Sequence, residues 1–276
     1  MAVYAAAFLL SVVSSTMLVF AVALARTGGE RSHLQTVAFE FALSAPGLIA
    51  GAAVNSAVLA AVAFSAARLH GGSVGAQLRL APTGASPLGT LAACAGLVGL
   101  SFACGAAREL LRVQGTGGMD ALADSLQGSS AGRLLAAILA IGAAPGFAEE
   151  TFFRGYMQTR LVASWGRWPA IVVASAAFGL IHLDPVQGSV AFAGGIFLGW
   201  VVERLGGLRP SILAHVTNNV IFVAVAAFAS GAAAGPSGQI AMLAAGSVVC
   251  VGAVLLLRSP RALRPEGAPP DGGPST

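Results

Sequence analysis

Three charged residues lie close together in a very apolar stretch of this sequence, which runs from Leu134 to Tyr156. Glu149 and Glu150 are adjacent, and Arg154 follows four residues after the second acid. Hydrocarbon offers a charge no water, so ionisable residues at that depth are rare unless they face a cavity, have a partner or take part in function. We therefore expect this segment to carry the chemistry of the protein.

The spacing of these charges predicts different tasks for the two acids. Consecutive residues of an α-helix point about 100° apart, whereas residues four apart share a face. Glu150 should therefore form an ion pair with Arg154, which leaves Glu149 free to act as a general base. Pro145 and Gly146, just before the acids, should kink or loosen the helix and make room for water or an extended peptide. The alternative is a structural ion pair beside a spare acid.

Further polar residues occur in later apolar segments, again four apart. Phe178 and His182 share one helical face, so the aromatic ring can support the imidazole. His215 and Asn219 have the same spacing. A single histidine within a membrane often only hydrogen-bonds to another helix. Two histidines together with Glu149 favour an active site inside the membrane.

The elements that must position these residues are membrane-spanning helices. Of the 276 residues 56% are hydrophobic and 9% are charged, whereas roughly a quarter of a soluble domain is charged. A helix rising about 1.5 Å per residue needs about 20 apolar residues to cross about 30 Å of hydrocarbon. The sequence therefore predicts an all-α, polytopic membrane helix bundle. The eight expected spans lie near 2–25, 41–67, 87–107, 133–160, 168–184, 186–203, 209–229 and 238–257.

We expect residues 1–257 to form a single transmembrane domain, with the motifs in a catalytic core at about 134–230. Residues 258–276 are rich in Pro and Gly with almost nothing to bury, so we expect a disordered cytoplasmic tail. Every basic residue is an arginine, and no basic run is interleaved with aromatics. The net charge of +4 therefore indicates loop arginines that set topology, and no nucleic-acid partner is expected.

Loop arginines predict the orientation, because the cytoplasmic side of a membrane protein carries the excess of positive charge. Ten arginines against five place both termini in the cytoplasm. The larger group is Arg68, Arg79, Arg154, Arg160, Arg167, Arg204, Arg209, Arg258, Arg261 and Arg264, and the smaller is Arg26, Arg31, Arg108, Arg112 and Arg133.

The three motifs occur in a recognisable order: Glu149-Glu150-x-x-x-Arg154, then Phe178-x-x-x-His182, then His215-x-x-x-Asn219. Together they resemble the CPBP family, also called the ABI family, of CAAX-processing and bacteriocin-processing intramembrane endopeptidases. The resemblance covers about residues 134–230.

The resemblance implies a multi-helix bundle in which Glu149 and His182 activate a water for attack on a peptide carbonyl. His215 and Asn219 would stabilise the oxyanion. The implied partners are a membrane-anchored peptide or protein substrate and the lipid bilayer. The cofactor stays open: a glutamate-activated water needs no metal, while Glu149, His182 and His215 could also hold Zn²⁺ with one position open, although the sequence has no HExxH motif.

Two other classes of function compete with an endopeptidase. A non-catalytic protein of the bacteriocin-immunity type would keep the fold without turnover, but all three motifs are intact. A proton-coupled transporter would also place Glu and His inside the membrane. The absence of an internal repeat argues against that class.

Overall fold

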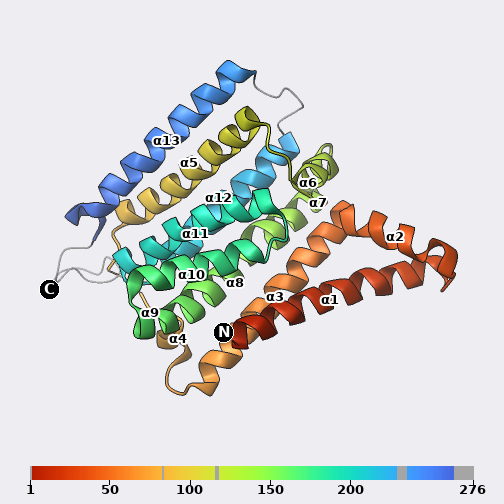
Figure 1. Cartoon of the computed structure of the whole chain (residues 1–276), viewed down its shortest axis with the longest axis horizontal. Helices are drawn as coiled ribbons and strands as arrows, with labels where there is room; N and C mark the ends of the chain where they lie inside the picture. The colour runs from red at the N-terminus through yellow and green to blue at the C-terminus, as the bar shows by residue number, and fades with distance from the viewer. Residues whose placement is uncertain (1, 83, 116–117, 229–234, 264–276) are drawn as a thin grey trace.

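The computed structural model describes residues 2–82, 84–115, 118–228 and 235–263, without the side chains of residues 118–120. These residues form a bundle of helices (Figure 1). Seven helical stretches are long and apolar enough to cross a membrane. They are α1 (Ala2–Thr27), α3 (Ala45–Leu69), α5 (Pro87–Leu111), the interrupted helix Ala131–Trp165, α11 (Pro185–Leu205), α12 (Arg209–Phe228) and α13 (Pro236–Arg258). The predicted polytopic helix bundle is confirmed.

The expected fifth span, 168–184, is shorter than predicted. The helix here, α10, covers Arg167–Leu180, and its 14 residues rise only about 21 Å. It ends early because the next helix begins at Pro185, where the Asp184 carboxylate accepts a hydrogen bond of 2.7 Å from the Gln187 backbone N–H. Leu183 takes a left-handed conformation with φ of 54° and reverses the chain. His182 therefore lies in a turn just after the helix.

The fourth span is a 35-residue helix that switches to π-helical winding twice. It consists of α7 (Ala131–Ala137), the π-helix η1 (Ile138–Ala143), α8 (Ala144–Glu149), the π-helix η2 (Glu150–Gln158) and α9 (Thr159–Trp165). Pro145 has no backbone N–H, so the Ile141 carbonyl lacks its α-helical donor. The neighbouring Ala144 N–H reaches back five residues to the Leu139 carbonyl. The disturbance expected at Pro145 is thus accommodated as π-helical winding.

The four remaining short elements were not predicted. They are α2 (Arg31–Leu43), α4 (Val74–Gln77), α6 (Gly118–Leu126) and the 3₁₀ turn η3 (Pro260–Ala262). The last of these alters the expected boundary of the tail. Ala262 is buried, and its carbonyl accepts a 3.0 Å hydrogen bond from the Ser86 N–H at the start of α5. Residues 258–263 of the expected tail thus belong to the described structure, and residues 264–276 lie outside the described residues.

The helices that carry the motifs lie together in the middle of the bundle (Figure 1). Helix α10 packs along α11, to which a turn of four residues joins it, as expected for neighbouring antiparallel helices. Helix α8 packs on α12, and α5 and α13 cover α11 and α12 from one side. On the other side α1 is fixed to α10 by a 3.1 Å hydrogen bond from the Tyr4 hydroxyl to the Ala177 carbonyl. The motif helices are therefore enclosed by neighbours.

Candidate active site

Glu150 and Arg154 form the predicted ion pair. Arg154 Nη1 lies 2.8 Å from Glu150 Oε1, and both side chains are fully buried. Glu150 has two further partners that the local spacing did not predict. Its Oε2 accepts a hydrogen bond from the Ser211 hydroxyl, and its Oε1 lies 2.9 Å from His215 Nδ1. The carboxylate of Glu150 thus connects the first motif to α12.

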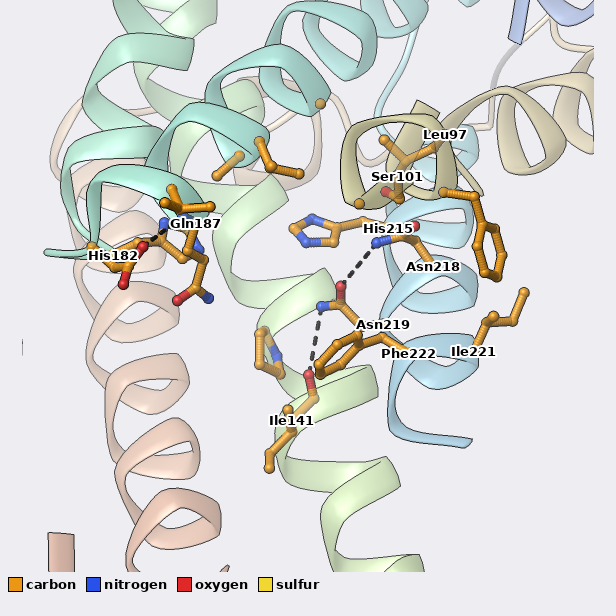
Figure 2. Close-up of a pocket in the computed structure, with 18 of the residues that line it drawn as sticks. Leu97, Ser101, Ile141, His182, Gln187, His215, Asn218, Asn219, Ile221 and Phe222 are labelled. Atoms are coloured by element: carbon orange, nitrogen blue, oxygen red, sulfur yellow. Dashed lines mark hydrogen bonds between the residues drawn. The ribbon is translucent and has the colours of Figure 1, made fainter. Parts of the chain in front are cut away.

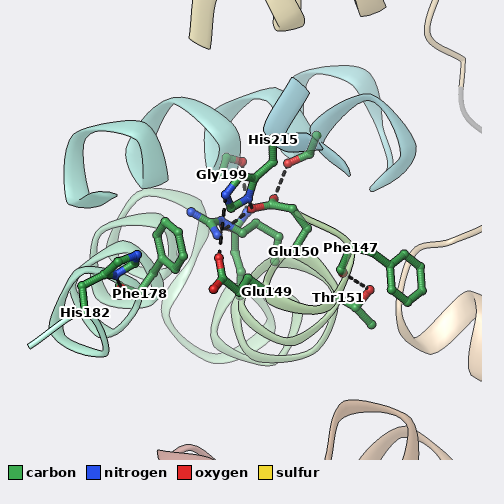
Figure 3. Close-up of polar contacts among 11 residues, drawn as sticks. Phe147, Glu149, Glu150, Thr151, Phe178, His182, Gly199 and His215 are labelled. Atoms are coloured by element: carbon green, nitrogen blue, oxygen red, sulfur yellow. Dashed lines mark hydrogen bonds and ion pairs between the residues drawn. The ribbon is translucent and has the colours of Figure 1, made fainter. Parts of the chain in front are cut away.

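Glu149 lies on the other side of the same histidine. Its Oε2 is 3.7 Å from His215 Nε2, so the imidazole ring lies between the two acids (Figure 3). Gly146 allows this close approach of α8 to α12, because a Cβ atom there would lie 2.9 Å from the Val216 backbone nitrogen. The small residue before the acids therefore brings Glu149 within reach of His215.

The Phe178 ring contacts the Arg154 guanidinium and the rings of both histidines. The guanidinium carbon of Arg154 lies 4.4 Å from the centre of its ring, and both histidine rings meet it edge-on. The ring centres of His182 and His215 are 5.2 and 5.7 Å from that of Phe178. Phe178 thus supports His182, as predicted, and also stands between His182 and the pair Glu149 and His215 (Figure 3).

Asn219 is positioned by the irregular winding of the fourth span. Its side-chain amide donates a 3.5 Å hydrogen bond to the Ile141 carbonyl, the group deprived of its α-helical donor by Pro145. Its own amide oxygen accepts a 3.4 Å hydrogen bond from the Asn218 amide (Figure 2). One N–H of the Asn219 amide stays available for another acceptor, because a primary amide has two.

A cavity of about 500 Å³ lies between these groups. Four of the six predicted site residues line it, namely Glu149, His182, His215 and Asn219. Figure 2 shows His182 and Gln187 on one wall, opposite His215, Asn218 and Asn219. Most of the remaining lining is apolar, contributed by α5, α11 and α12. Glu150 and Arg154 are packed behind this wall and hold His215 in place.

The structure adds polar residues that the sequence did not single out. Ser211 precedes His215 by four residues, so its place on the same helical face could have been read from the spacing. Asn218 and Gln187 line the cavity without belonging to any motif. Their neighbours along the chain are apolar or uncharged, and no local pattern distinguished them.

The donor groups do not form a metal site in this arrangement. In the part of the chain that the structure describes, no group of three or more His, Cys, Asp or Glu side chains is placed to hold a metal ion. The candidate zinc ligands Glu149, His182 and His215 share a cavity, but Phe178 stands between His182 and the other two. We therefore assign no chemical step to a metal.

Long apolar helices surrounding a cavity that a carboxylate, two imidazoles and an amide help to line are typical of an integral membrane protein with a site enclosed among its helices. Residues 131–221 match the family model described as type II CAAX prenyl endopeptidase Rce1-like. The chain therefore carries an Rce1-like domain, consistent with a protease of the CPBP family. The matched region contains all three motifs. No curated protein and no solved structure matches the chain.

Proposed function

We propose that this protein is an intramembrane endopeptidase that hydrolyses a peptide bond in a membrane-anchored substrate. The observation that carries the proposal is the cavity wall itself, where a carboxylate, two imidazoles and an amide face one space inside a bundle of apolar helices. An Rce1-like domain over the same residues supports the reaction class. The substrate would be a CAAX-like tail, a C-terminal sorting signal or an exported peptide.

Glu149 is proposed as the general base. Its carboxylate takes a proton from a water molecule, and the water oxygen bonds to the carbonyl carbon of the substrate. His182 lies on the opposite wall of the cavity, beyond Phe178, and is proposed to accept a hydrogen bond from the bound substrate. Its Nδ1 lies 3.0 Å from the Phe178 carbonyl, to which an N–H at this position donates, so that Nε2 of the neutral ring is left to accept a hydrogen bond. The proton on Glu149 then passes to the departing amine as the C–N bond breaks.

His215 and Asn219 are proposed to stabilise the oxyanion. The Glu150 carboxylate lies 2.9 Å from His215 Nδ1, and a carboxylate at this nitrogen orients an imidazole. The proposed role is that an N–H on His215 Nε2 donates to the developing negative charge, together with the second N–H of Asn219. Glu150, held by Arg154 and Ser211, is thereby a positioning residue for His215.

The test is cleavage of membrane-anchored peptides by the purified protein in detergent. Replacing Glu149 with Gln or His182 with Ala should lower the cleavage rate by about 10²- to 10⁴-fold, the usual contribution of a positioned acid or base. Glu40→Gln and His33→Ala, at exposed positions of α2, are matched controls that should keep full activity. Undiminished cleavage in both site variants would contradict the proposed site. Proton flux in liposomes that Glu149→Gln abolishes, without any peptide hydrolysis, would indicate a transporter instead.

Metal dependence is tested in the same assay. Because no step is assigned to a metal, we expect activity to survive prolonged treatment with a strong chelator. Loss of activity that Zn²⁺ restores would replace the glutamate mechanism with a zinc-bound hydroxide.

A further inference from the structure

The cavity extends to one end of the bundle only. More than half of its lining comes from the second halves of α5, α10 and α12 and from the first halves of α11 and α13, whereas Leu97, Leu198 and His215 lie in the other halves of α5, α11 and α12. Consecutive spans alternate in direction, so these five halves lie at the same end of the bundle. Arg108, near the end of α5, and Met242, near the start of α13, are among the lining residues furthest from the middle of their helices. The space therefore runs from Glu149 toward the end where α2 and α6 lie (Figure 1).

The opposite end of the bundle is packed shut by described side chains. Glu203, near the end of α11, forms an ion pair with Arg79 and accepts a 3.0 Å hydrogen bond from the Gln158 amide. The same amide also donates to the Gly199 carbonyl, and Gln158 is fully buried. Leu78 and Leu208 are fully buried beside this network, and the Leu208 N–H donates to the Arg79 carbonyl. Polar and apolar groups together separate Glu149 from this end.

The closed end is also the arginine-rich end. Of the ten arginines assigned to one side by the sequence, Arg154 is withdrawn because it is fully buried inside the fourth span, and Arg264 lies outside the described residues. The other eight are at the ends of α3, α11 and α13, at the starts of α9, α10 and α12, or in adjoining segments at that end. Trp165 and Trp168, which are 51% and 58% exposed, flank the turn between α9 and α10. Exposed tryptophans are typical of either membrane–water interface, and the excess of arginines assigns this one to the cytoplasmic side.

We infer that the cavity receives its substrate from the non-cytoplasmic side of the membrane, so that the substrate class is a translocated, membrane-anchored peptide. The substrate class rests on the proposed function, whereas the side on which the cavity opens does not. The cleft opens away from the arginine-rich end, and that end faces the cytoplasm by its charge. A peptide tail that stays in the cytoplasm would meet the closed end of the bundle.

Single cysteines labelled in sealed membrane vesicles test this sidedness. In a background with Cys94, Cys104 and Cys250 replaced by Ala, one cysteine is introduced at each of three positions. Gln187 lines the cavity, Ser189 is exposed near the start of α11, and Ser164 is exposed near the end of α9. A membrane-impermeant maleimide should label Gln187→Cys and Ser189→Cys in right-side-out vesicles. It should label Ser164→Cys only in inverted vesicles.

Each result of the labelling decides the inference. Labelling of Gln187→Cys from the side that labels Ser164→Cys would overturn it, as would labelling of Ser164→Cys from outside. Labelling of Gln187→Cys from neither side until detergent is added would also overturn it.

A second measurement separates this inference from the proposed function. After labelling from outside, the protein is solubilised and its peptide cleavage measured, and the Gln187→Cys protein should lose activity while the Ser164→Cys protein keeps it. If unlabelled protein in detergent cleaves no peptide, the proposed function fails while the sidedness still follows from the labelling. If it cleaves peptides but labelling shows a cytoplasmic cleft, only the sidedness is wrong.

Discussion

Glu150 has three side-chain partners. Arg154, Ser211 and His215 all contact its two oxygens, and none of the carboxylate is exposed. Glu149, one residue earlier, lies 3.7 Å from His215 and faces the cavity. Two adjacent acids of the same type therefore have different environments, which suits one for orienting a neighbour and the other for proton transfer.

Removing one charge of the buried pair Glu150 and Arg154 should lower the free energy of unfolding more than removing both charges. Arg154→Ala leaves the Glu150 carboxylate without its cation in a low-dielectric interior, so the free energy of unfolding should fall by about 3–5 kcal/mol. The double variant Glu150→Gln, Arg154→Met has no buried charge at this position and should recover most of that loss. It should not recover cleavage, because His215 has lost its anionic partner.

Thermal unfolding in detergent and peptide cleavage measure these two effects separately. Arg31→Ala, at an exposed position at the start of α2, is the control for loss of an arginine and should change neither. An Arg154→Ala protein with unchanged stability and full activity would show that the pair has neither role.

At the scale of helices, the winding of the fourth span connects it to Asn219. Pro145 leaves the Ile141 carbonyl without its α-helical donor, and Asn219 supplies one from α12. Pro145→Ala returns a backbone N–H that competes for the same acceptor. We expect stability to be unchanged or higher, because a proline inside a helix is unfavourable.

The rate of cleavage should fall for Pro145→Ala while substrate affinity changes little, because Asn219 is released from the position proposed for oxyanion binding. The measurement is kcat and KM for a membrane-anchored peptide. Gly252→Ala, in a part of α13 where an added Cβ meets nothing within 4 Å, is the matched helix control. A higher kcat in Pro145→Ala would contradict the assigned role of the Asn219 contact.

Several of these features followed from the sequence, because they depend on local spacing or composition. The spans are long and apolar, and the pairing of Glu150 with Arg154 needs only one helical turn. The contact of His215 with Glu150 joins residues 65 positions apart, which no local pattern specifies. The early end of α10 was also missed, because Ile181 and Leu183 are as apolar as the helix before them.

At the scale of the whole molecule, the side chains that close the arginine-rich end are separate from those that line the cavity. Glu203 binds Arg79 and Gln158 at the arginine-rich end and does not line the cavity. Glu203→Ala removes the carboxylate that accepts hydrogen bonds from the buried Gln158 amide and from the Arg79 guanidinium. An unsatisfied buried group costs about 1–3 kcal/mol, so the unfolding midpoint should fall.

Cleavage per folded molecule should stay unchanged in Glu203→Ala, since its network lies away from Glu149. The comparison is made at a temperature where the variant is folded, with the folded fraction measured by size-exclusion chromatography. A large drop in kcat under these conditions would mean that the two ends are coupled.

Because of the π-helix η2, the positions of Glu149 and Gln158 depend on the number of residues in the fourth span as well as on its composition. A π-helix, with i→i+5 hydrogen bonds, turns less per residue than an α-helix does. Deleting Met157, which belongs to no motif, should return the stretch to α-helical winding and so change the directions in which its two flanks face relative to each other. Glu149 and Gln158 could then no longer both meet His215 and Glu203. We expect this one-residue deletion to abolish cleavage where Met157→Leu does not, so that this segment accepts substitutions far more readily than gaps.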